Sequence, residues 1–508
     1  MSRMMSSMTS PLDVLGSPQP VRRTPSQKSR TQILVTGVAA LTVLLTGVSY
    51  AGYSAIAPHG HAPEEALPAE TVAFAKVDLD PSTSQKVAVY RLSKRFPSAH
   101  VKSDRSVRDD LLNQVFQAAG EDVDYKKDIK PWVGDRAAVG ALPGADAPHP
   151  ILAVQFHDRA KALKGVQHLK AINGSGDLFF AFSDVDDYVL LSDTQAVVDK
   201  AAHAKRHLAD DSGFRSAMRS LEGDQIVTAW ADLAKVFALM PKGQVEDNPL
   251  FAAKDLKVRG QYVLGAHAEN DAIEVDVHEL GAATGVAAVD QLRFGKGTGS
   301  DLVQTFPSDA VAAVGISGLG TTLAEVYDQV QKALTDVEGN DFQRTVTQAG
   351  LHLPADLRTV FGDEVAGYVS GTGDDPVGVL HVKTKHADAA KAVLAHVIDA
   401  VGSFDGDPAA PGSLDSIYRK VGDGYVVGFP ERALSGSTKG GLGSTKAFRR
   451  AVPDAHRAPF IVFVNIGAIA SRFHLADGSA TVSRLEAFGL TERVNGDDVS
   501  MKARLTFR

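Results

Sequence analysis

The feature that most constrains the fold of this chain is an internal repeat, because most of the sequence after residue 66 is written twice. Six short segments recur in the same order, at an offset that stays between 226 and 239 residues. The matched segments are 67–73 with 306–312, 132–135 with 360–363, 149–150 with 375–376, 188–189 with 425–426, 214–215 with 448–449, and 226–227 with 461–462. Each match is weak alone, but six in the same order predict two similar lobes, 66–280 and 300–508, joined by a glycine-rich linker at 281–299.

Strand-like and helix-like patterns alternate within each copy. Strands are predicted at 72–79, 137–142, 151–156, 178–182 and 188–191. Asp158 is expected to cap a helix that carries Ala162, Val166 and Leu169 on one face, and Asp388 to start its counterpart. Both copies close with a hairpin, at 260–279 and 492–507, and such short turns join antiparallel strands. We therefore predict an α+β fold of two similar lobes, each an antiparallel sheet with packed helices, preceded by one transmembrane helix.

Residues 33–57, ILVTGVAALTVLLTGVSYAGYSAIA, form a run of 25 residues without a charge. As a helix this run would be about 37 Å long, enough to cross a hydrocarbon core of about 30 Å. Five basic residues and one acidic residue precede it, whereas Glu64, Glu65 and Glu70 follow it. The positive-inside rule therefore predicts a single-pass anchor in the cell membrane, with residues 1–32 in the cytoplasm and the C-terminal part outside.

A cleaved signal peptide is the alternative, with Ser49 and Ala51 as a small-x-small cleavage site. We favour a retained anchor because a polar leader of 32 residues is long for a signal peptide. The leader is rich in Ser, Thr and Pro, which predicts a disordered tail. Residues 58–65 then form a short spacer before the first lobe.

Charge and cysteine content exclude several classes of function. The net charge is −8, and because the first 32 residues carry +4, the remainder carries −12. An acidic globular part is poorly suited to phosphate backbones, so we expect no nucleic-acid partner. The chain has no cysteine, which excludes disulfides, thiolate catalysis and cysteine-ligated zinc or iron–sulfur sites.

Two longer segments carry a resemblance to a known family. Together with the leader and the uncharged run, LPAETVAFAKVDLDPS at 67–82 and PWVGDRAA at 131–138 resemble actinobacterial membrane-anchored extracytoplasmic proteins of unknown function with a duplicated domain. The resemblance covers most of residues 30–508, and its motifs are structural in character. It implies the anchor and the two lobes, and it transfers no catalytic residue.

Two carboxylates leave the first predicted strand on the same face, namely Asp78 and Asp80. Such a pair can bind a metal or act in acid–base chemistry. We interpret Asp80 instead as the cap of a helix that begins at Pro81, because the second copy has Ser317 and Leu319 at the matching positions.

Other acidic positions also have structural explanations. Asp184, Asp186 and Asp187 lack the DxDxDG pattern and distal Glu of a calcium loop, so they predict a solvated turn. The acidic positions shared between the copies are in Gly134-Asp135 and Gly362-Asp363, where a turn or capping role is an equal explanation. Trp132 has Val360 as its counterpart, which indicates core packing.

Histidine pairs are the next candidates for metal binding. His203 and His207 are four residues apart on a predicted helix, a spacing that can place two imidazoles on one metal. The HExxH pattern is missing, and Lys205 and Arg206 between them favour an exposed amphipathic face. Weaker pairs are His381 with His386 and, in the spacer, His59 with His61.

Glycines 440, 441 and 443 within SGSTKGGLGSTK could bind phosphate through backbone amides, but the P-loop order is not met and a mobile loop is predicted. The sequence contains no GxSxG, SxxK or HxxEH pattern. We therefore assign no catalytic, cofactor-binding or metal-ligating residue.

The sequence leads us to expect an uncharacterised envelope protein that acts as a non-catalytic binding or interaction module. Its partner would be the membrane through residues 33–57 and, through the lobes, an envelope protein, a lipid or a wall polymer. The alternatives are an extracytoplasmic hydrolase or transferase with an unrecognised site, and a lipid carrier. Converging titratable residues in a deep pocket would favour the enzyme, an exposed apolar patch the interaction module, and an apolar tunnel the carrier.

Overall fold

A computed structural model provides the fold, and it describes most of the chain from residue 60 onward. The described residues are 60–78, 81–95, 125–145, 147–172, 178–239, 257–285, 290, 293, 299–334, 344, 346–348, 350–371, 376–405, 414–434, 440–475, 479 and 481–508. The leader and the uncharged run at 33–57 therefore lie outside the described residues. Among the helices that are described, none is long and apolar enough to cross a membrane.

The described chain is a mixed α/β structure in which strands dominate. The strands are β1 (Ala73–Asp78), β2 (Val133–Leu142), β3 (His149–Phe156), β4 (Phe179–Phe182), β5 (Tyr188–Ser192), β6 (Val227–Asp232), β7 (Arg259–Ala268), β8 (Ala272–Ala283), β9 (Ala312–Ser317), β10 (Glu364–Ser370), β11 (Val377–Lys383), β12 (Tyr418–Val421), β13 (Gly424–Phe429), β14 (Phe460–Val464), β15 (Leu485–Asn495) and β16 (Asp498–Phe507). The α-helices are α2 (Pro63–Ala66), α3 (Thr83–Ser93), α5 (Arg159–Ile172), α6 (Gln195–Ala202), α7 (Ser212–Ser220), α8 (Leu233–Ala238), α11 (Leu302–Thr305), α12 (Leu319–Leu334), α14 (Ala355–Phe361), α15 (Ala387–Asp405), α16 (Leu414–Ile417), α17 (Lys446–Ala451) and α18 (Ile466–Arg472).

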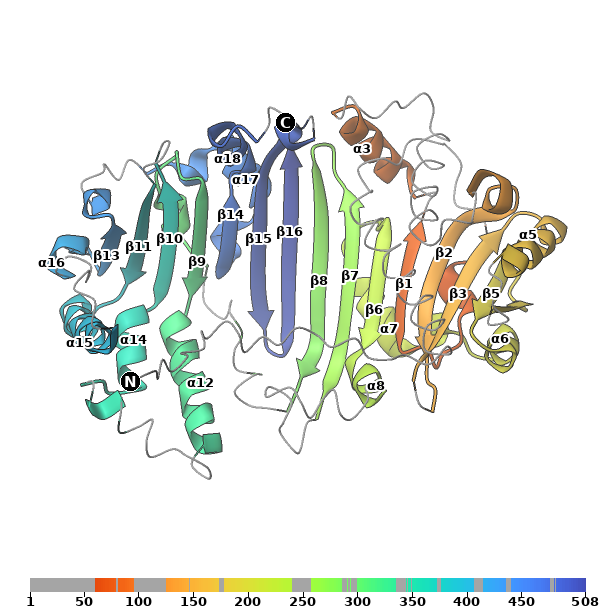
Figure 1. Ribbon diagram of the computed structural model, residues 1–508, viewed down its shortest axis with the longest axis horizontal. Coiled ribbons are helices and arrows are strands. Elements are labelled where there is room, and N and C mark those ends of the chain that lie inside the picture. Colours follow the sequence, from red (N-terminus) through yellow and green to blue (C-terminus); the bar gives the residue numbers. More distant parts are fainter. Residues whose placement is uncertain are drawn as a thin grey trace, which may run out of the picture.

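All the strands belong to one antiparallel sheet of 16 strands, in the order β12-β13-β11-β10-β9-β14-β15-β16-β8-β7-β6-β1-β2-β3-β5-β4. Figure 1 shows this row of strands across the molecule, with β8 and β16 side by side at its centre. The sequence predicted two lobes with a sheet each. Instead, β8 of the first half pairs with β16 of the second, and this pairing, which we call the seam, joins them into a continuous sheet.

The order of the strands on one side of the seam repeats on the other. Outward from the seam, the first half reads β8-β7-β6-β1-β2-β3-β5-β4 and the second reads β16-β15-β14-β9-β10-β11-β13-β12. The register repeats as well. The match of 67–73 with 306–312 makes Ala73 and Ala312 equivalent. The match of 132–135 with 360–363, extended along the strands, makes Ala141 and Val369 equivalent. In the structure, Ala73 pairs with Ala141, and Ala312 pairs with Val369 in the same way.

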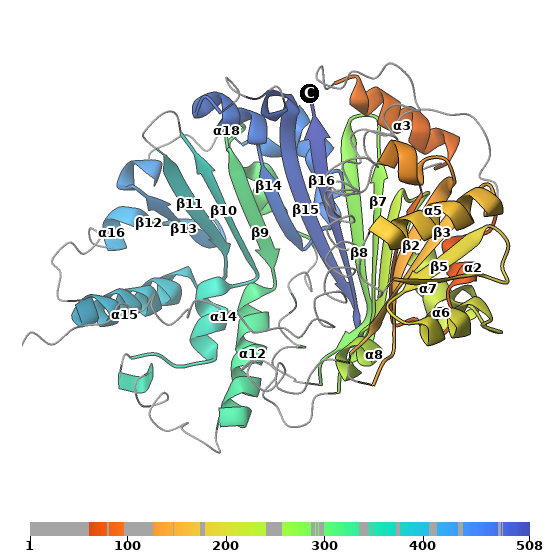
Figure 2. The same ribbon diagram turned by 45° about the vertical axis from the view of Figure 1, so that its right-hand side comes forward.

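The equivalence of the two halves can be followed from β1 and β9, strand by strand, to the seam. Each step moves to the partner on the next strand toward the seam. In the first half the steps lead from Ala73 to Ala231, Tyr262 and Glu279. In the second half they lead from Ala312 to Val464, Phe488 and Leu505. Exchanging the halves turns the seam pair Glu279 with Val499 into Leu505 with Ile273, which is also a seam pair. The halves are therefore related by an approximate two-fold axis that passes close to the pair Asp276 and Lys502. Figure 2 agrees, because α3 after β1 lies at one end of the strands and α12 after β9 at the other.

Helices cover both faces of the first half. On one face, Phe214 and Ala217 of α7 pack with Phe74 and Trp230 of the sheet, and the Phe214 ring meets the Trp230 ring edge-on at 5.2 Å. On the other face, α5 packs on strands β3 and β5. Neighbouring residues 188 and 189 belong to these two different cores, as the alternation of a strand requires. The sheet is thus the middle of three layers.

The second half has the same layers. Phe448 of α17 packs against Phe463 on one face, at 5.2 Å between ring centroids, and α15 packs against Val382 and Tyr425 on the other. Tyr188 and Tyr425 match in the sequence, yet they lie in cores on opposite faces. The position equivalent to Tyr425 is Val189, because a slip of one residue reverses the face of a strand residue.

Local patterns predicted many elements correctly. The predicted strands of the first copy are β1 to β5, and the two closing hairpins are β7–β8 and β15–β16, the second turning at Gly496 with φ +64°. The Asp158 side chain accepts from the Lys161 amide at 3.0 Å at the start of α5, as predicted. The helix predicted to begin at Pro81 starts instead at Thr83, where the Ser82 hydroxyl accepts from the Gln85 amide. Asp80, the predicted cap, lies outside the described residues.

Candidate functional site

The histidines that the sequence singled out do not come together as predicted. Helix α6 ends at Ala202, so His203 and His207 do not share a helix and that prediction is wrong. His203 Nδ1 lies within hydrogen-bond distance of the Asp184 carboxylate, at 2.9 Å, and residue 207 pairs with Pro68 in an isolated bridge. The spacing of four residues therefore has no helical meaning here.

The other histidine pairs are also placed within structural elements. His381 lies within β11, where burial lowers the pKa of its imidazole, and His386 lies at the turn before α15. His61 Nδ1 is hydrogen-bonded to the Glu65 carboxylate at 2.6 Å, whereas His59 lies outside the described residues. None of these histidines belongs to the one described group of side chains that could hold a metal ion.

The acidic candidates are engaged in turns and ion pairs. Asp78 approaches Arg136 at 3.4 Å, and Asp184 lies with Asp186 and Asp187 in the turn between β4 and β5. The prediction of a solvated turn is confirmed there. Gly134 and Asp135 lie within β2, and Asp135 is 4.0 Å from His157. In the second half, Gly362 ends α14 with φ +52° and Asp363 precedes β10, so the two Gly-Asp pairs lie in different local structures.

Trp132 and the glycine-rich segment have structural roles. Trp132 is buried in the α5 core, and its indole Nε1 donates to the Asp128 carbonyl at 2.7 Å, so core packing is confirmed. In the segment at 440–443, the amides of Gly441 and Leu442 both donate to the Phe306 carbonyl, at 3.0 and 2.9 Å. Because these amides are already bonded, they form no phosphate cradle.

A cluster of six titratable residues lies on the seam, and the sequence analysis missed it. We call it the seam cluster: His267 on β7, Glu269 directly after β7, Glu274 and Asp276 on β8, and Lys502 and Arg504 on β16. Glu274 and Asp276 are 3% and 4% exposed, so their charges need partners. The signal was present as charges two residues apart on both strands, which places them on one face.

Ion pairs across the seam supply those partners. Lys502 Nζ lies 2.8 Å from Glu274 Oε1 and 3.5 Å from Asp276 Oδ1. Arg504 donates to Glu274 Oε2 at 2.6 Å and also contacts the Glu269 carboxylate. His267 approaches the same two buried carboxylates at 3.7 and 3.8 Å. The first half thus provides the carboxylates, and the second half provides Lys502 and Arg504.

These contacts shift the pKa values of the two buried acids in opposite directions. Burial alone would raise the pKa of Glu274, but the hydrogen bond and charge of Lys502, with the charge of Arg504, hold it below its usual value. Burial raises the pKa of Asp276, and the negative charge of Glu274 adds to this increase. Asp276 Oδ2 and His267 Nδ1, 3.8 Å apart, are buried, and neither has a hydrogen-bond partner among the described residues.

Two carboxyl groups with separated pKa values are also a feature of acid–base catalysis. The atoms of His267, Glu269 and Glu274 lie within 4.8 Å of one another, close enough to share a metal ion. However, Arg504 bridges the two glutamates and Lys502 binds Glu274, so a metal would have to displace both cations. We interpret the seam cluster as an ion-pair network that joins the halves.

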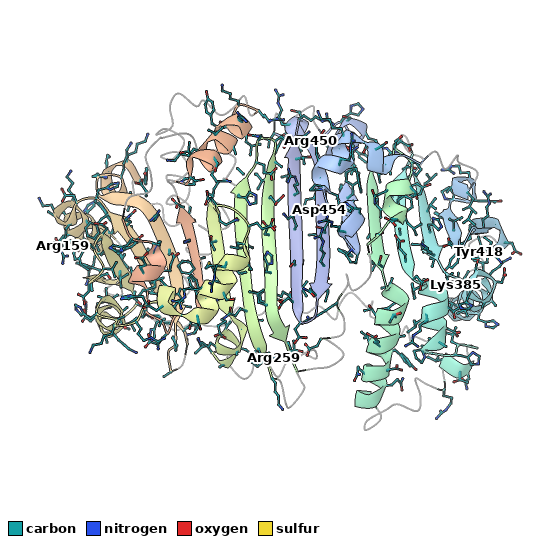
Figure 3. The ribbon with its side chains drawn as sticks, turned by 180° about the vertical axis from the view of Figure 1, so that it is seen from behind. Arg159, Arg259, Lys385, Tyr418, Arg450 and Asp454 are labelled. Atoms are coloured by element: carbon teal, nitrogen blue, oxygen red, sulfur yellow. The ribbon has the colours of Figure 1, made fainter. Side chains whose placement is uncertain are left out.

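Another cross-half contact reinforces the seam at one end. Arg450 of α17 forms an ion pair with Asp271 in the β7–β8 turn at 2.6 Å, and it also contacts the Glu486 carboxylate. Its guanidinium donates to the Phe507 carbonyl at 2.9 Å. Figure 3 shows Arg450 at the end of the central strands. The protein is therefore built on a single antiparallel sheet, and the seam cluster joins the two halves of that sheet.

Comparison with known proteins places the chain in one family. The chain belongs to the family described as a protein of unknown function, DUF3352, whose model matches residues 33–403. No curated protein and no solved structure matches the chain.

Proposed function

We propose that this chain is a single-pass, membrane-anchored protein of the cell envelope whose sheet acts outside the membrane as a non-catalytic binding or interaction module. The observation that carries the location is the uncharged run at 33–57, with cations before it and acidic residues after it. The first described helix, α2, begins at Pro63, and β1 of the sheet begins at Ala73, so the sheet would follow the proposed anchor closely in the chain.

We further infer that the two halves arose by duplication and kept a dimer-like arrangement, in an actinobacterial family. The repeated strand order and the repeated register support this inference, together with the sequence matches of 67–73 with 306–312 and of 132–135 with 360–363. In an ancestral homodimer, position 276 would have faced its own copy across the two-fold axis. Asp276 now faces Lys502, so the two copies have diverged into complementary charges.

The non-catalytic part of the proposal rests on how the titratable groups are used. The buried acids of the seam cluster are held by Lys502 and Arg504, and the candidate histidines lie in separate elements. Exposed apolar side chains gather instead on the second half, where Leu380 and Val314 flank Gly367 on one face of the sheet. Phe429, at the end of β13, is 69% exposed. Such surface suits a partner better than a reaction.

A test of location can use the absence of cysteine from the chain. A single cysteine is introduced at Ser6 in the leader or at Lys385, which is exposed on the second half (Figure 3). Intact cells are then treated with a membrane-impermeant maleimide. We expect labelling of Lys385→Cys in intact cells and of Ser6→Cys only after permeabilisation.

The reverse pattern, or labelling of both only after permeabilisation, would exclude the proposed topology. Loss of the leader from the mature chain, seen as a shorter protein by mass spectrometry, would instead favour the cleaved signal peptide. A hydrolase or transferase and a lipid carrier remain the alternative functions. Turnover of a wall or lipid substrate by the purified protein would establish the enzyme, and co-purification of a stoichiometric lipid the carrier.

A further inference from the structure

A surface hollow of about 370 Å³ lies on the first half, at the end of β2 beside α6. Pro68, Leu142 and Val197 are among the apolar side chains that form its walls. Lys200, Lys205 and Arg206 provide cations around them. Its volume is at the lower end of the range of small-molecule sites, about 300 to 1,000 Å³.

The walls of the hollow are fixed by the backbone. The Ala69 amide donates to the Arg206 carbonyl at 3.0 Å, and the Leu208 amide donates to the Leu67 carbonyl at 2.8 Å. Leu67 and Leu208 are completely buried beneath it, as is Ala202 at the end of α6. The two segments that form the hollow are therefore joined to each other and to the core, so its shape exists before any ligand binds.

The charges around the hollow are unbalanced. Lys200, Lys205 and Arg206 are exposed, and none of them forms an ion pair with the part of the chain that the structure describes. His203 is engaged with Asp184, and Glu70 is the acidic residue in the lining. A net positive site in a chain with a net charge of −8 attracts anions locally.

The apolar walls and the cations around them together indicate the chemistry of a ligand. Apolar walls favour burial of an apolar group, and lysine and arginine side chains bind phosphate or carboxylate, the arginine through paired hydrogen bonds. Neither inorganic phosphate nor a neutral lipid would satisfy both parts. We propose that the hollow binds an anionic amphiphile, a molecule with a phosphate or carboxylate group beside an apolar chain or ring.

Binding is measured by ligand-observed NMR on the full-length protein in phosphatidylcholine nanodiscs. The probes are dihexanoyl phosphatidic acid, dihexanoyl phosphatidylcholine and inorganic phosphate, which separate the charge from the chain. We expect phosphatidic acid to bind at least about tenfold more tightly than either of the others. The triple variant Lys200→Gln, Lys205→Gln, Arg206→Gln should lose about tenfold of that affinity.

The matched control is the triple variant Lys164→Gln, Lys385→Gln, Lys446→Gln. These three lysines are exposed and lie outside the hollow, and their substitution removes the same total charge. This control should bind phosphatidic acid as the wild type does. Equal affinity for phosphatidylcholine would overturn the anionic part of the proposal, and equal affinity for inorganic phosphate the apolar part. Unchanged binding by the first variant, or an equal loss in the control, would overturn the location. None of these outcomes depends on whether residues 33–57 anchor the chain.

Discussion

At the scale of single residues, the seam cluster shows how buried charges are kept. Glu274 and Asp276 are almost fully buried, and Lys502 contacts both of them from the other half of the chain. Lys502→Met would leave Asp276 without its cation in a buried site. We expect a loss of about 3 kcal/mol in the free energy of unfolding, measured by urea denaturation at pH 7.

The matched control for Lys502 is Lys420→Met, because Lys420 also pairs with an aspartate, Asp388 at 2.6 Å, but both side chains are exposed. That change should cost less than about 1 kcal/mol. Equal losses in the two variants would contradict the burial argument.

The pKa of Glu274 is lowered in the folded protein, so its contribution to stability is full above its ordinary value of 4.5 and declines as the pH falls below it.

The pKa of Glu492 on β15 is shifted in the opposite direction to that of Glu274. Burial, with the charge of Glu279, raises its pKa to about 7 from 4.5. The folded protein therefore binds this proton more tightly than the unfolded chain, so stability falls as the pH rises from 4.5 to about 7, and the full loss remains at higher pH. Glu492→Gln should stabilise the protein at pH 8, by about 1 kcal/mol after allowance for solvent screening, and the difference should disappear near pH 4.5. A difference that does not change with pH would exclude this pKa.

At the scale of elements, α5 is positioned by the contact of a glycine with a tryptophan. A Cβ at Gly165 would lie 2.0 Å from Nε1 of the Trp132 indole, which already donates to Asp128. Gly165→Ala should therefore destabilise the protein by about 1 to 2 kcal/mol, although alanine favours helix formation. Lys164→Ala, at the exposed neighbouring position, should change the midpoint of thermal unfolding little. A more stable Gly165→Ala variant would refute the contact.

The sequence predicted elements where a local pattern determines them. Alternating strands, the Asp158 cap and the Asn495-Gly496 turn all act over a few residues, and the structure contains each of them. The start of α3 and the histidine helix were wrong, because Ser82 offers an alternative cap and α6 ends at Ala202. The pairing of β8 with β16 joins residues more than 200 positions apart, so no local pattern could predict the seam or its cluster.

At the scale of the whole molecule, a continuous sheet implies that the two halves unfold together. Both tryptophans, Trp132 and Trp230, belong to the first half, so their fluorescence reports on that half alone. Ala503→Pro in β16 removes a ladder hydrogen bond beside the seam and should cost about 3 kcal/mol or more.

The tryptophan transition should shift to lower denaturant by the same amount as circular dichroism, which reports on both halves. The control is Ala503→Ser, which keeps the amide. A tryptophan transition that stays at its wild-type midpoint in Ala503→Pro would show that the halves are independent domains.

The central claim is that the sheet is a binding module presented outside the membrane. It is tested most directly by in-cell crosslinking of the full-length protein, followed by purification from membranes and mass spectrometry. The control retains the leader and the uncharged run but lacks residues 66–508. The account predicts an envelope protein, lipid or wall polymer that is recovered with the full chain and not with the control. Recovery of the same molecules with both chains would contradict it.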